Sequence, residues 1–334
     1  MNKIQISKIC DTFHLGKVLS DATPVSGGLI HRMWRINTSQ GSYAIKELDA
    51  TIMKRPGIYE SYIQSEQIAT LLKGKQIPAA TALFLNQTTP LYEVDGIIVM
   101  VFAWVDGKIL TLKQVTTEHA KQIGAILATI HTANIKPMDL FIPEVHLIPE
   151  EQWYSLVSKA ISKKLSWAVA ANTNLPNLIT WSNAYQEAKL RLNRRLVISH
   201  TDMDPKNVLW CDDTSPVLID WEGAGLINPT AEVINVALEW AGMTDDLFKE
   251  SIFLAVIEGY CNHGGSVIES DVYDALYGLI GGCLGWLEFN MCRSLDSTKF
   301  DVKAQKLGLE ETEMTLTKLH FLAANIERFI QLIQ

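Results

Sequence analysis

The stretch Ser199–Trp210, SHTDMDPKNVLW, places a histidine, two aspartates, a lysine and an asparagine directly before a short apolar run. Asp202 and Asn207 lie five residues apart within it. Such polar side chains are common in solvated turns, but they also supply the groups that acid–base chemistry and metal binding require. The sequence that follows decides between these two interpretations.

Two apolar runs follow this polar stretch. Val208–Trp210 and Val217–Ile219 flank residues 211–216, where Asp, Thr, Ser and Pro are typical of a turn. We therefore expect a β-hairpin, which would bring Asp220 back beside Asn207.

Asp202, Asn207 and Asp220 would then converge on one place. Mg²⁺ binds a few hard oxygen ligands together with phosphate oxygens, and Asn207 and Asp220 supply such ligands. Asp202 stays free to orient a hydroxyl group and to accept its proton. These are the components of a phosphoryl-transfer site.

The rest of the chain divides into a β-rich first third with one helix and a mostly helical remainder. The predicted strands are Met33–Asn37, Tyr43–Leu48 and Gly96–Trp104, and the predicted helix is Glu60–Lys73. Gly74 is expected to cap that helix. From about residue 115 the apolar period is helical, with long segments at 150–195 and 230–334.

The catalytic stretch resembles that of a known family. HTDMDPKN fits the kinase pattern in which an Asp is followed by four residues and Asn, and residues 219–224 read IDWEGA in place of Asp-Phe-Gly. The loop, its spacing and the Asp-Trp-Glu triplet together resemble the aminoglycoside phosphotransferase and choline kinase-like family, over roughly residues 20 to 295.

This resemblance implies an α+β, two-lobed protein-kinase-like fold. A small antiparallel β-rich lobe with one helix, residues 1–104 including the hinge, would bind the nucleotide. A large, mostly helical lobe, residues 105–334, would carry the catalytic and acceptor-binding groups. ATP would be the phosphate donor, with Asp202 as the base and with Asn207 and Asp220 holding Mg²⁺. His200 would brace the loop rather than transfer protons.

Lys46 is implied to bind the phosphates of ATP. It lies in a predicted strand after a glycine-containing turn and a hairpin, which is the position of the phosphate-binding lysine in kinases. Glu66 on the following helix would be its acidic partner, and Glu60 on the same helix is the alternative.

Two other segments are implied to contact the nucleotide. Ser26, Gly27 and Gly28 would form the turn over the phosphates, and His31 stands where this family often has Asn. The expected hinge contacts to adenine are the backbone groups of Met100, Val101 and Ala103. Their register stays open, and so does GTP as the donor.

The acceptor is expected to be a small molecule with a hydroxyl group. The chain has a net charge of -8, and residues 105–334 hold 29 acidic against 19 basic residues. An acidic second part favours an amine-bearing acceptor, such as an aminoglycoside or a choline-like alcohol. The candidate acceptor residues are Glu222, Glu232, Glu239 and Trp240.

Composition argues against several other classes of protein. The net negative charge without a basic stripe disfavours a nucleic-acid partner. The five scattered cysteines fit neither a disulfide framework nor a zinc site, and they favour a cytoplasmic location. No uncharged apolar run of about eighteen residues is present, so no membrane-spanning helix is expected. The start of the chain lacks the apolar core of a secretory signal.

Two alternatives stay open. The first is a kinase that acts on a neutral small molecule or on a protein hydroxyl. The long segment 136–195 before the catalytic loop and the lack of an Ala-Pro-Glu segment after Asp220 disfavour a protein substrate. The second is a catalytically silent nucleotide-binding scaffold, which the presence of every expected catalytic residue type disfavours.

Overall fold

The computed structural model describes residues 1–25, 30–135, 140 and 147–334. The chain divides into two compact units. Unit 1 contains Met1–Lys113, Ala133–Leu140 and Ile198–Gly225, and unit 2 contains Gln114–Thr132, Phe141–Val197 and Leu226–Gln334. These units are defined by contacts within the chain. The predicted boundary between residues 104 and 105 instead divides the chain by function, into a nucleotide-binding part and a catalytic part, and it stays a prediction.

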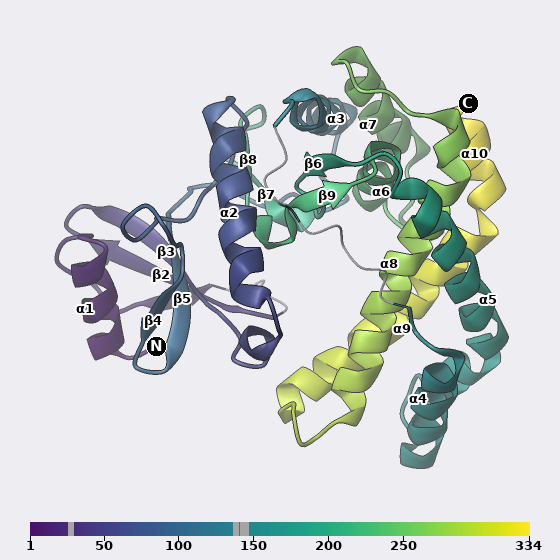
Figure 1. Cartoon of the computed structure of the whole chain (residues 1–334), viewed down its shortest axis with the longest axis horizontal. Helices are drawn as coiled ribbons and strands as arrows, with labels where there is room; N and C mark the ends of the chain where they lie inside the picture. Colours follow the sequence, from purple (N-terminus) through teal and green to yellow (C-terminus); the bar gives the residue numbers. More distant parts are fainter. Residues whose placement is uncertain (26–29, 136–139, 141–146) are drawn as a thin grey trace. The chain divides into compact units, whose positions relative to one another are not determined.

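In its described residues, unit 1 contains a five-stranded antiparallel sheet in the order β1-β2-β3-β5-β4 (Figure 1). The strands are β1 (Thr23–Val25), β2 (Arg32–Thr38), β3 (Gly41–Glu47), β4 (Tyr92–Val94) and β5 (Ile97–Ala103). The predicted strands Met33–Asn37 and Tyr43–Leu48 correspond to β2 and β3, which form a hairpin from Arg32 opposite Glu47 to Thr38 opposite Gly41. The sheet provides the rigid support for Lys46, which lies near the end of β3.

Two helices pack against this sheet. Helix α2 (Ile58–Gly74) confirms the predicted helix, although Gly74 is its last residue rather than a residue beyond it. Helix α1 (Lys3–Thr12) was not predicted. Its first turn carries a capping box in which Asn2 and Gln5 exchange hydrogen bonds of 2.9 Å, a signal that is readable in the sequence.

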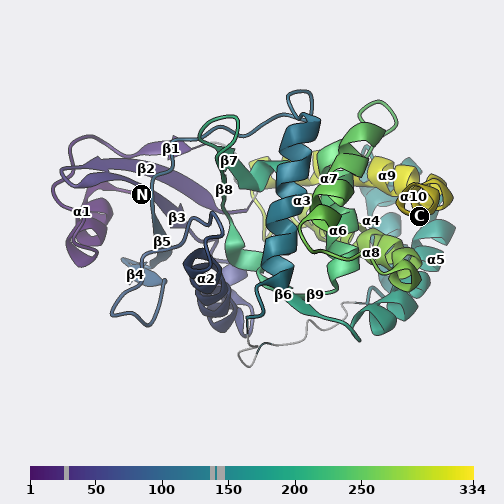
Figure 2. The same ribbon diagram turned by 90° about the horizontal axis from the view of Figure 1, so that it is seen from above.

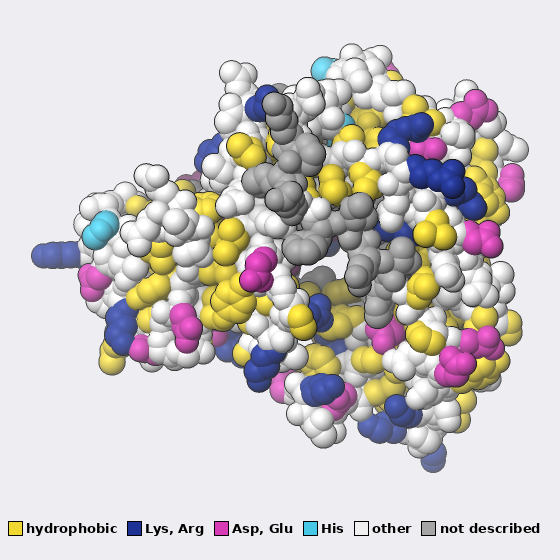
Figure 3. All heavy atoms as spheres, viewed as in Figure 1, with side chains coloured by type: hydrophobic (Ala, Val, Ile, Leu, Met, Phe, Trp, Pro, Cys, Tyr) yellow, Lys and Arg dark blue, Asp and Glu magenta, His cyan; other side chains and the backbone are white. Residues whose placement is uncertain are grey.

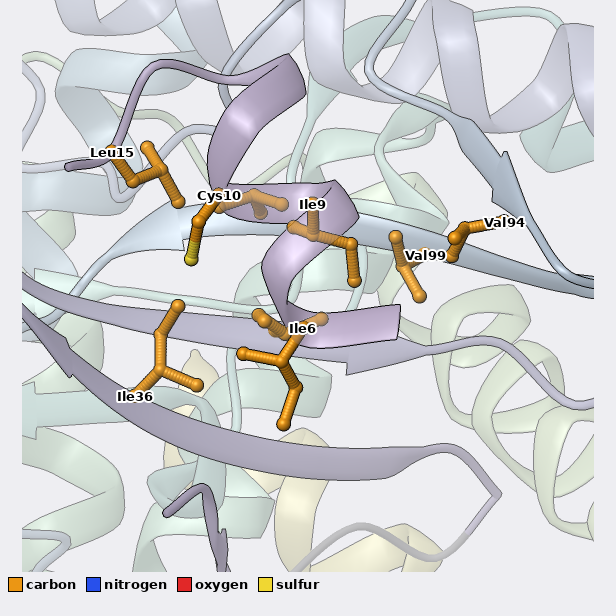
Figure 4. Close-up of a cluster of buried hydrophobic side chains, with 9 residues drawn as sticks. Ile6, Ile9, Cys10, Leu15, Ile36, Val94 and Val99 are labelled. Atoms are coloured by element: carbon orange, nitrogen blue, oxygen red, sulfur yellow. The ribbon is translucent and has the colours of Figure 1, made fainter. Parts of the chain in front are cut away.

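The two faces of the sheet have different partners. Ile36 and Val99 pack with Ile9 of α1 in one buried apolar cluster (Figure 4). Met100, the next residue of β5, packs instead in a second cluster that includes residues of α2. Residues paired across antiparallel strands share a face, and Lys46 pairs with Met100. The alternation of the strands therefore places Lys46 on the face that α2 covers.

The segment Ile198–Gly225 contains the predicted catalytic hairpin. The short strands in and around it are β6 (Val197–Ser199), β7 (Val208–Trp210), β8 (Pro216–Leu218) and β9 (Gly225–Ile227). β7 and β8 pair antiparallel with Val208 opposite Leu218. In the turn, the carboxylate of Asp212 accepts a hydrogen bond from the backbone N–H of Thr214 at 2.8 Å, and this bond lowers the pKa of Asp212.

Unit 2 is mostly helical in its described residues, as predicted from about residue 115 onward. Its helices are α3 (Thr117–Thr132), α4 (Glu150–Lys163), α5 (Ala168–Leu192), α6 (Pro229–Ala241), α7 (Glu250–Asn262), α8 (Glu269–Leu295), α9 (Val302–Ala324) and α10 (Ile326–Ile333). Helices α3, α6 and α7 lie against one another (Figure 2). Among the described helices of the chain, none combines the length and the apolar character that crossing a bilayer requires.

Helices α3 and α7 approach each other closely because both carry glycine at the contact. A Cβ atom on Gly124 would lie 2.1 Å from the carbonyl oxygen of Val256. A Cβ atom on Gly259 would lie 2.1 Å from the carbonyl oxygen of Lys121. Any larger residue at either position would therefore force the backbones of α3 and α7 apart.

Substitution Gly259→Ala is expected to destabilise the protein by about 2–3 kcal/mol, since overpacking against backbone cannot relax through a side chain. The free energy of unfolding from urea titration measures this effect. Gly282→Ala in α8 is the matched control, because no atom lies within 4 Å of its added Cβ. It should be neutral or stabilise by up to about 1 kcal/mol. Equal effects of the two substitutions would contradict the close packing of α3 on α7.

Candidate active site

His200 fixes the catalytic stretch to the turn that follows β8. Its Nδ1 lies 3.3 Å from the backbone N–H of Asp202, which donates to it, and its Nε2 lies 3.0 Å from the carbonyl oxygen of Ile219. The ring is fully buried and packs on Trp221, with 4.4 Å between ring centroids. These contacts show His200 in the bracing position that the sequence predicted.

Two residues of the site have left-handed backbone conformations. Thr201 has φ of 67° and Asp220 has φ of 62°, values that are unfavourable for residues other than glycine. The hydroxyl of Thr201 donates to the carbonyl oxygen of Gly223 at 2.6 Å and ties the loop to the turn. Such strain persists only where its surroundings enforce it. Here it sets the directions of the side chains of Asp202 and Asp220.

Asn207 holds the predicted base. Its Nδ2 donates to both the carbonyl oxygen and Oδ2 of Asp202, each at 2.8 Å. Asn207 is buried, whereas the side chain of Asp202 is half exposed. The Asp202 carboxylate is therefore fixed in orientation and still open to an incoming molecule.

Lys46 contacts Asp220, the predicted metal ligand, directly. Its ammonium donates to Oδ1 of Asp220 at 2.5 Å and also to Oε2 of Glu222. Burial by itself would lower the pKa of Lys46, but the charges of Asp220 and Glu222 outweigh it and raise that pKa. Lys46 is therefore a fixed cation beside Asp220.

The predicted ion pair between Lys46 and Glu66 is not formed in this structure. Oε2 of Glu66 accepts the backbone N–H of Ala82 at 2.8 Å. Burial raises the pKa of Glu66 to about 7, although the Ala82 hydrogen bond and the charge of Lys46 oppose the shift. Glu60, the alternative partner, is exposed in the first turn of α2. Neither helix carboxylate takes the place that Glu222 occupies at Lys46.

Asn207 and Asp220 suit a hard divalent cation. Ile219 N–H donates to the backbone oxygen of Asn207 at 2.9 Å, which keeps the two ends of the hairpin together. The Asn207 amide oxygen and the second oxygen of Asp220 make no hydrogen bond with the described part of the chain. Amide and carboxylate oxygens are the ligands that Mg²⁺ accepts alongside phosphate. The donor set therefore fits the predicted metal, and both residues stay predicted ligands.

The predicted adenine contacts fall at different depths in β5. Met100 and Val101 are buried within the strand, and the carbonyl oxygen of Val101 accepts the N–H of Leu83 at 2.7 Å. Ala103 is exposed at the end of the strand and is the most accessible of the three. The predicted phosphate turn, Ser26, Gly27 and Gly28, lies outside the described residues.

The candidate acceptor residues are divided between the two units. Glu222 contacts Lys46 in unit 1. In unit 2, Glu232 and Trp240 are buried in α6, and Glu232 lies 2.7 Å from His131. Glu239 is partly exposed and lies 3.7 Å from the ammonium of Lys318. The acceptor roles of all four residues stay predictions.

Sequence reasoning missed two residues of the site, His31 and Tyr62. Both are buried, and both contact Oε2 of Glu222 at 3.3 Å. Tyr62 lies one helical turn before Glu66 on α2, so its direction could have been read from the helical period. His31 was noted in the sequence only as a departure from the family's usual Asn.

The raised pKa of Glu66 predicts a pH dependence of stability. Its ordinary value is 4.5, so the folded chain holds this proton more tightly than the unfolded chain. The resulting stabilisation is complete below about pH 4.5 and is lost as the pH rises through about 7. It amounts to about 3 kcal/mol.

Urea unfolding at pH 5 and pH 8 should show this loss in the unmodified protein. Glu66→Gln should remove it, because the amide oxygen still accepts the Ala82 N–H but carries no charge. Glu60→Gln, an exposed position on the same helix, should leave the loss unchanged. The same pH response in both variants would rule out Glu66 as its source.

Comparison with known proteins defines the family. The sequence model of the phosphotransferase enzyme family matches residues 21–275. No curated protein matches the sequence significantly.

Solved structures of low sequence identity share the fold. Spectinomycin phosphotransferase APH(9)-Ia, in complex with ADP and spectinomycin, has a TM-score of 0.69 at 13% identity, over 96% of this chain and 98% of its own. Choline kinase LicA from Streptococcus pneumoniae has a TM-score of 0.60 at 19% identity, over 95% and 98%. Plasmodium vivax ethanolamine kinase has a TM-score of 0.59 at 15% identity, over 88% and 81%.

These structures confirm the predicted α+β, kinase-like fold. The family match extends from before β1 into α8 and includes both the sheet with Lys46 and the catalytic hairpin. The chain therefore belongs to the phosphotransferase enzyme family, which its catalytic motifs resemble.

Proposed function

We propose that this protein is an ATP-dependent kinase that transfers the γ-phosphate to a hydroxyl group of a small molecule. The proposal is carried by one observation, the direct contact of Lys46 with Asp220 beside the Asn207–Asp202 pair. The residues proposed as the phosphate-binding cation, the metal ligands and the base thus lie in one compact unit. These are the groups that phosphoryl transfer requires.

Asp202 accepts the proton of the attacking hydroxyl. Asn207 holds one oxygen of its carboxylate at 2.8 Å, so the other oxygen can face the acceptor. Lys206 lies 3.8 Å from the held oxygen and places a positive charge beside it. In phosphoryl transfer the protein acts mainly by positioning and by charge stabilisation, and a fixed carboxylate supplies the first of these.

Lys46, Asn207 and Asp220 form the donor side of the site. The ammonium of Lys46 binds phosphate oxygens of ATP, and Asn207 and Asp220 hold the metal. When bound, Mg²⁺ neutralises charge on the phosphates. ATP as the donor is supported by the ADP that the solved spectinomycin phosphotransferase contains.

An amine-bearing alcohol is the proposed acceptor class. Solved structures of the same fold include proteins named choline kinase and ethanolamine kinase, and the excess of acidic residues in positions 105–334 favours a cation. On the face drawn in Figure 3, acidic and basic side chains are interspersed, so the excess does not form one acidic surface there. Selectivity for an amine-bearing acceptor is therefore proposed to depend on a few local contacts with the bound molecule.

The proposed reaction is tested by ATP consumption with a panel of acceptors. The panel contains amino alcohols, aminoglycosides, macrolides and neutral sugars. Turnover with an amine-bearing alcohol is expected, and Asp202→Asn should lower kcat by a factor of about 10²–10⁴, the usual contribution of a general base.

Asp213→Asn serves as the matched control, because it makes the same change at an exposed position in the β7–β8 turn. Its kcat should equal that of the unmodified protein. Turnover that survives Asp202→Asn would contradict the assignment of the base. Mg²⁺-dependent ATP binding without turnover of any acceptor would favour a nucleotide-binding scaffold.

A further inference from the structure

His31 and Tyr62 form a hydrogen-bonded chain that ends on Glu222. The backbone N–H of Asp49 donates to Nδ1 of His31 at 3.0 Å. Nε2 of His31 lies 2.8 Å from the hydroxyl oxygen of Tyr62 and 3.3 Å from Oε2 of Glu222. The Tyr62 hydroxyl donates to the same Glu222 oxygen at 3.3 Å. These contacts connect the Asp-Trp-Glu turn to α2, to the start of β2 and to Asp49, all within unit 1.

The direction of each hydrogen bond in this chain follows from which atoms carry a proton. A backbone N–H can only donate, so Nδ1 of His31 must accept, and in the neutral ring the proton lies on Nε2. Nε2–H therefore points toward Tyr62 and Glu222. Burial and the charge of Glu222 raise the pKa of Tyr62, which keeps its hydroxyl protonated as a donor. The Lys46 ammonium and the Tyr62 hydroxyl therefore donate to Glu222. The Nε2–H of His31 points toward the Tyr62 oxygen at 2.8 Å, with Oε2 of Glu222 at 3.3 Å.

Glu222 is correspondingly held by three side chains. Its Oε2 accepts hydrogen bonds from the Lys46 ammonium and the Tyr62 hydroxyl and lies 3.3 Å from Nε2 of His31. Glu66 makes a different contact, since its Oε2 accepts the backbone N–H of Ala82. Glu222 is therefore the carboxylate that can balance and direct the buried ammonium.

The ammonium of Lys46 has three N–H donors in fixed tetrahedral directions. Asp220 accepts one and Glu222 accepts another. The third has no acceptor in the described part of the chain, and fixing the first two fixes its direction. A phosphate oxygen can take this third donor without displacing either carboxylate.

We propose that Glu222, and not the helix residue Glu66, is the carboxylate that orients Lys46 for ATP, and that His31 and Tyr62 are positioning residues that hold Glu222. The inference rests on the proposed function and deepens it. It gives His31 a specific role at the position where the sequence departs from the family's usual Asn. It also explains why Glu66 can bind a backbone N–H instead of the lysine.

The inference is tested by the Kd for ATP, measured by titration calorimetry in EDTA so that no metal contributes. Tyr62→Phe and His31→Asn should each raise the Kd about three- to tenfold, and Glu222→Gln about tenfold or more, as expected for hydrogen bonds to charged groups. If His31 and Tyr62 act through Glu222, their effects should vanish on the Glu222→Gln background. Each double variant should therefore match Glu222→Gln within about twofold.

Tyr92→Phe is the matched control. Its hydroxyl accepts a hydrogen bond from Thr12 at 3.0 Å in the same unit, away from Lys46, and its loss should leave the Kd unchanged. Thermal unfolding of each variant separates loss of the fold from loss of binding. If either Tyr62→Phe or His31→Asn does not fold, the other is sufficient for the test. Glu66→Gln should leave the Kd within about twofold of the unmodified value.

The possible outcomes separate this inference from the proposed function. The inference alone would be overturned if the increases in the Kd for ATP multiplied in the double variants. It would also be overturned if Glu222→Gln changed this Kd only in the presence of Mg²⁺. A larger loss of ATP affinity in Glu66→Gln than in Glu222→Gln would overturn it as well. Absence of ATP binding by the unmodified protein, with or without Mg²⁺, would overturn the proposed function and the inference with it.

Discussion

The buried ammonium of Lys46 is the constraint on which the site depends. A buried charge without a partner is strongly destabilising, so Lys46 requires carboxylates that are held equally firmly. Asp220 and Glu222 provide them from a segment 174 and 176 residues further along the chain. The same pairing that satisfies the lysine brings the β-sheet of unit 1 to the catalytic hairpin. The ion pairs of Lys46 with Asp220 and Glu222 therefore both stabilise the fold of unit 1 and arrange the groups of the candidate site.

The geometry around these charges is enforced by the backbone conformation and by hydrogen bonds between the loop and the turn. Thr201 and Asp220 keep left-handed conformations that the hairpin, the buried ring of His200 and the Thr201–Gly223 hydrogen bond maintain. The amide nitrogen of Asn207 donates to Asp202, and its amide oxygen makes no hydrogen bond with the described part of the chain. Phosphoryl transfer gains most from such preorganisation, because the chemistry itself needs little more than orientation and opposite charge.

Local patterns in the sequence predicted much of this arrangement. The β7–β8 hairpin, the strand of Lys46 and helix α2 depend on short-range alternation, helical period and turn residues, and the structure confirms them. The partner of Lys46 could not be read in the same way. Glu66 has the expected spacing, but the contact depends on tertiary packing that turns it to a backbone N–H. Burial of Glu232 is likewise a property of the assembled helices and not of its local sequence.

The most direct measurement is a crystal structure of the protein with a non-hydrolysable ATP analogue and Mg²⁺. The proposed site requires a phosphate oxygen within hydrogen-bond distance of the Lys46 ammonium, and a metal ion bound by the Asn207 amide oxygen and the Asp220 carboxylate. Glu222 should stay paired with Lys46 in that complex. A nucleotide that makes no contact with Lys46, or a metal ion held without Asn207 and Asp220, would contradict the assignment of these residues to phosphoryl transfer.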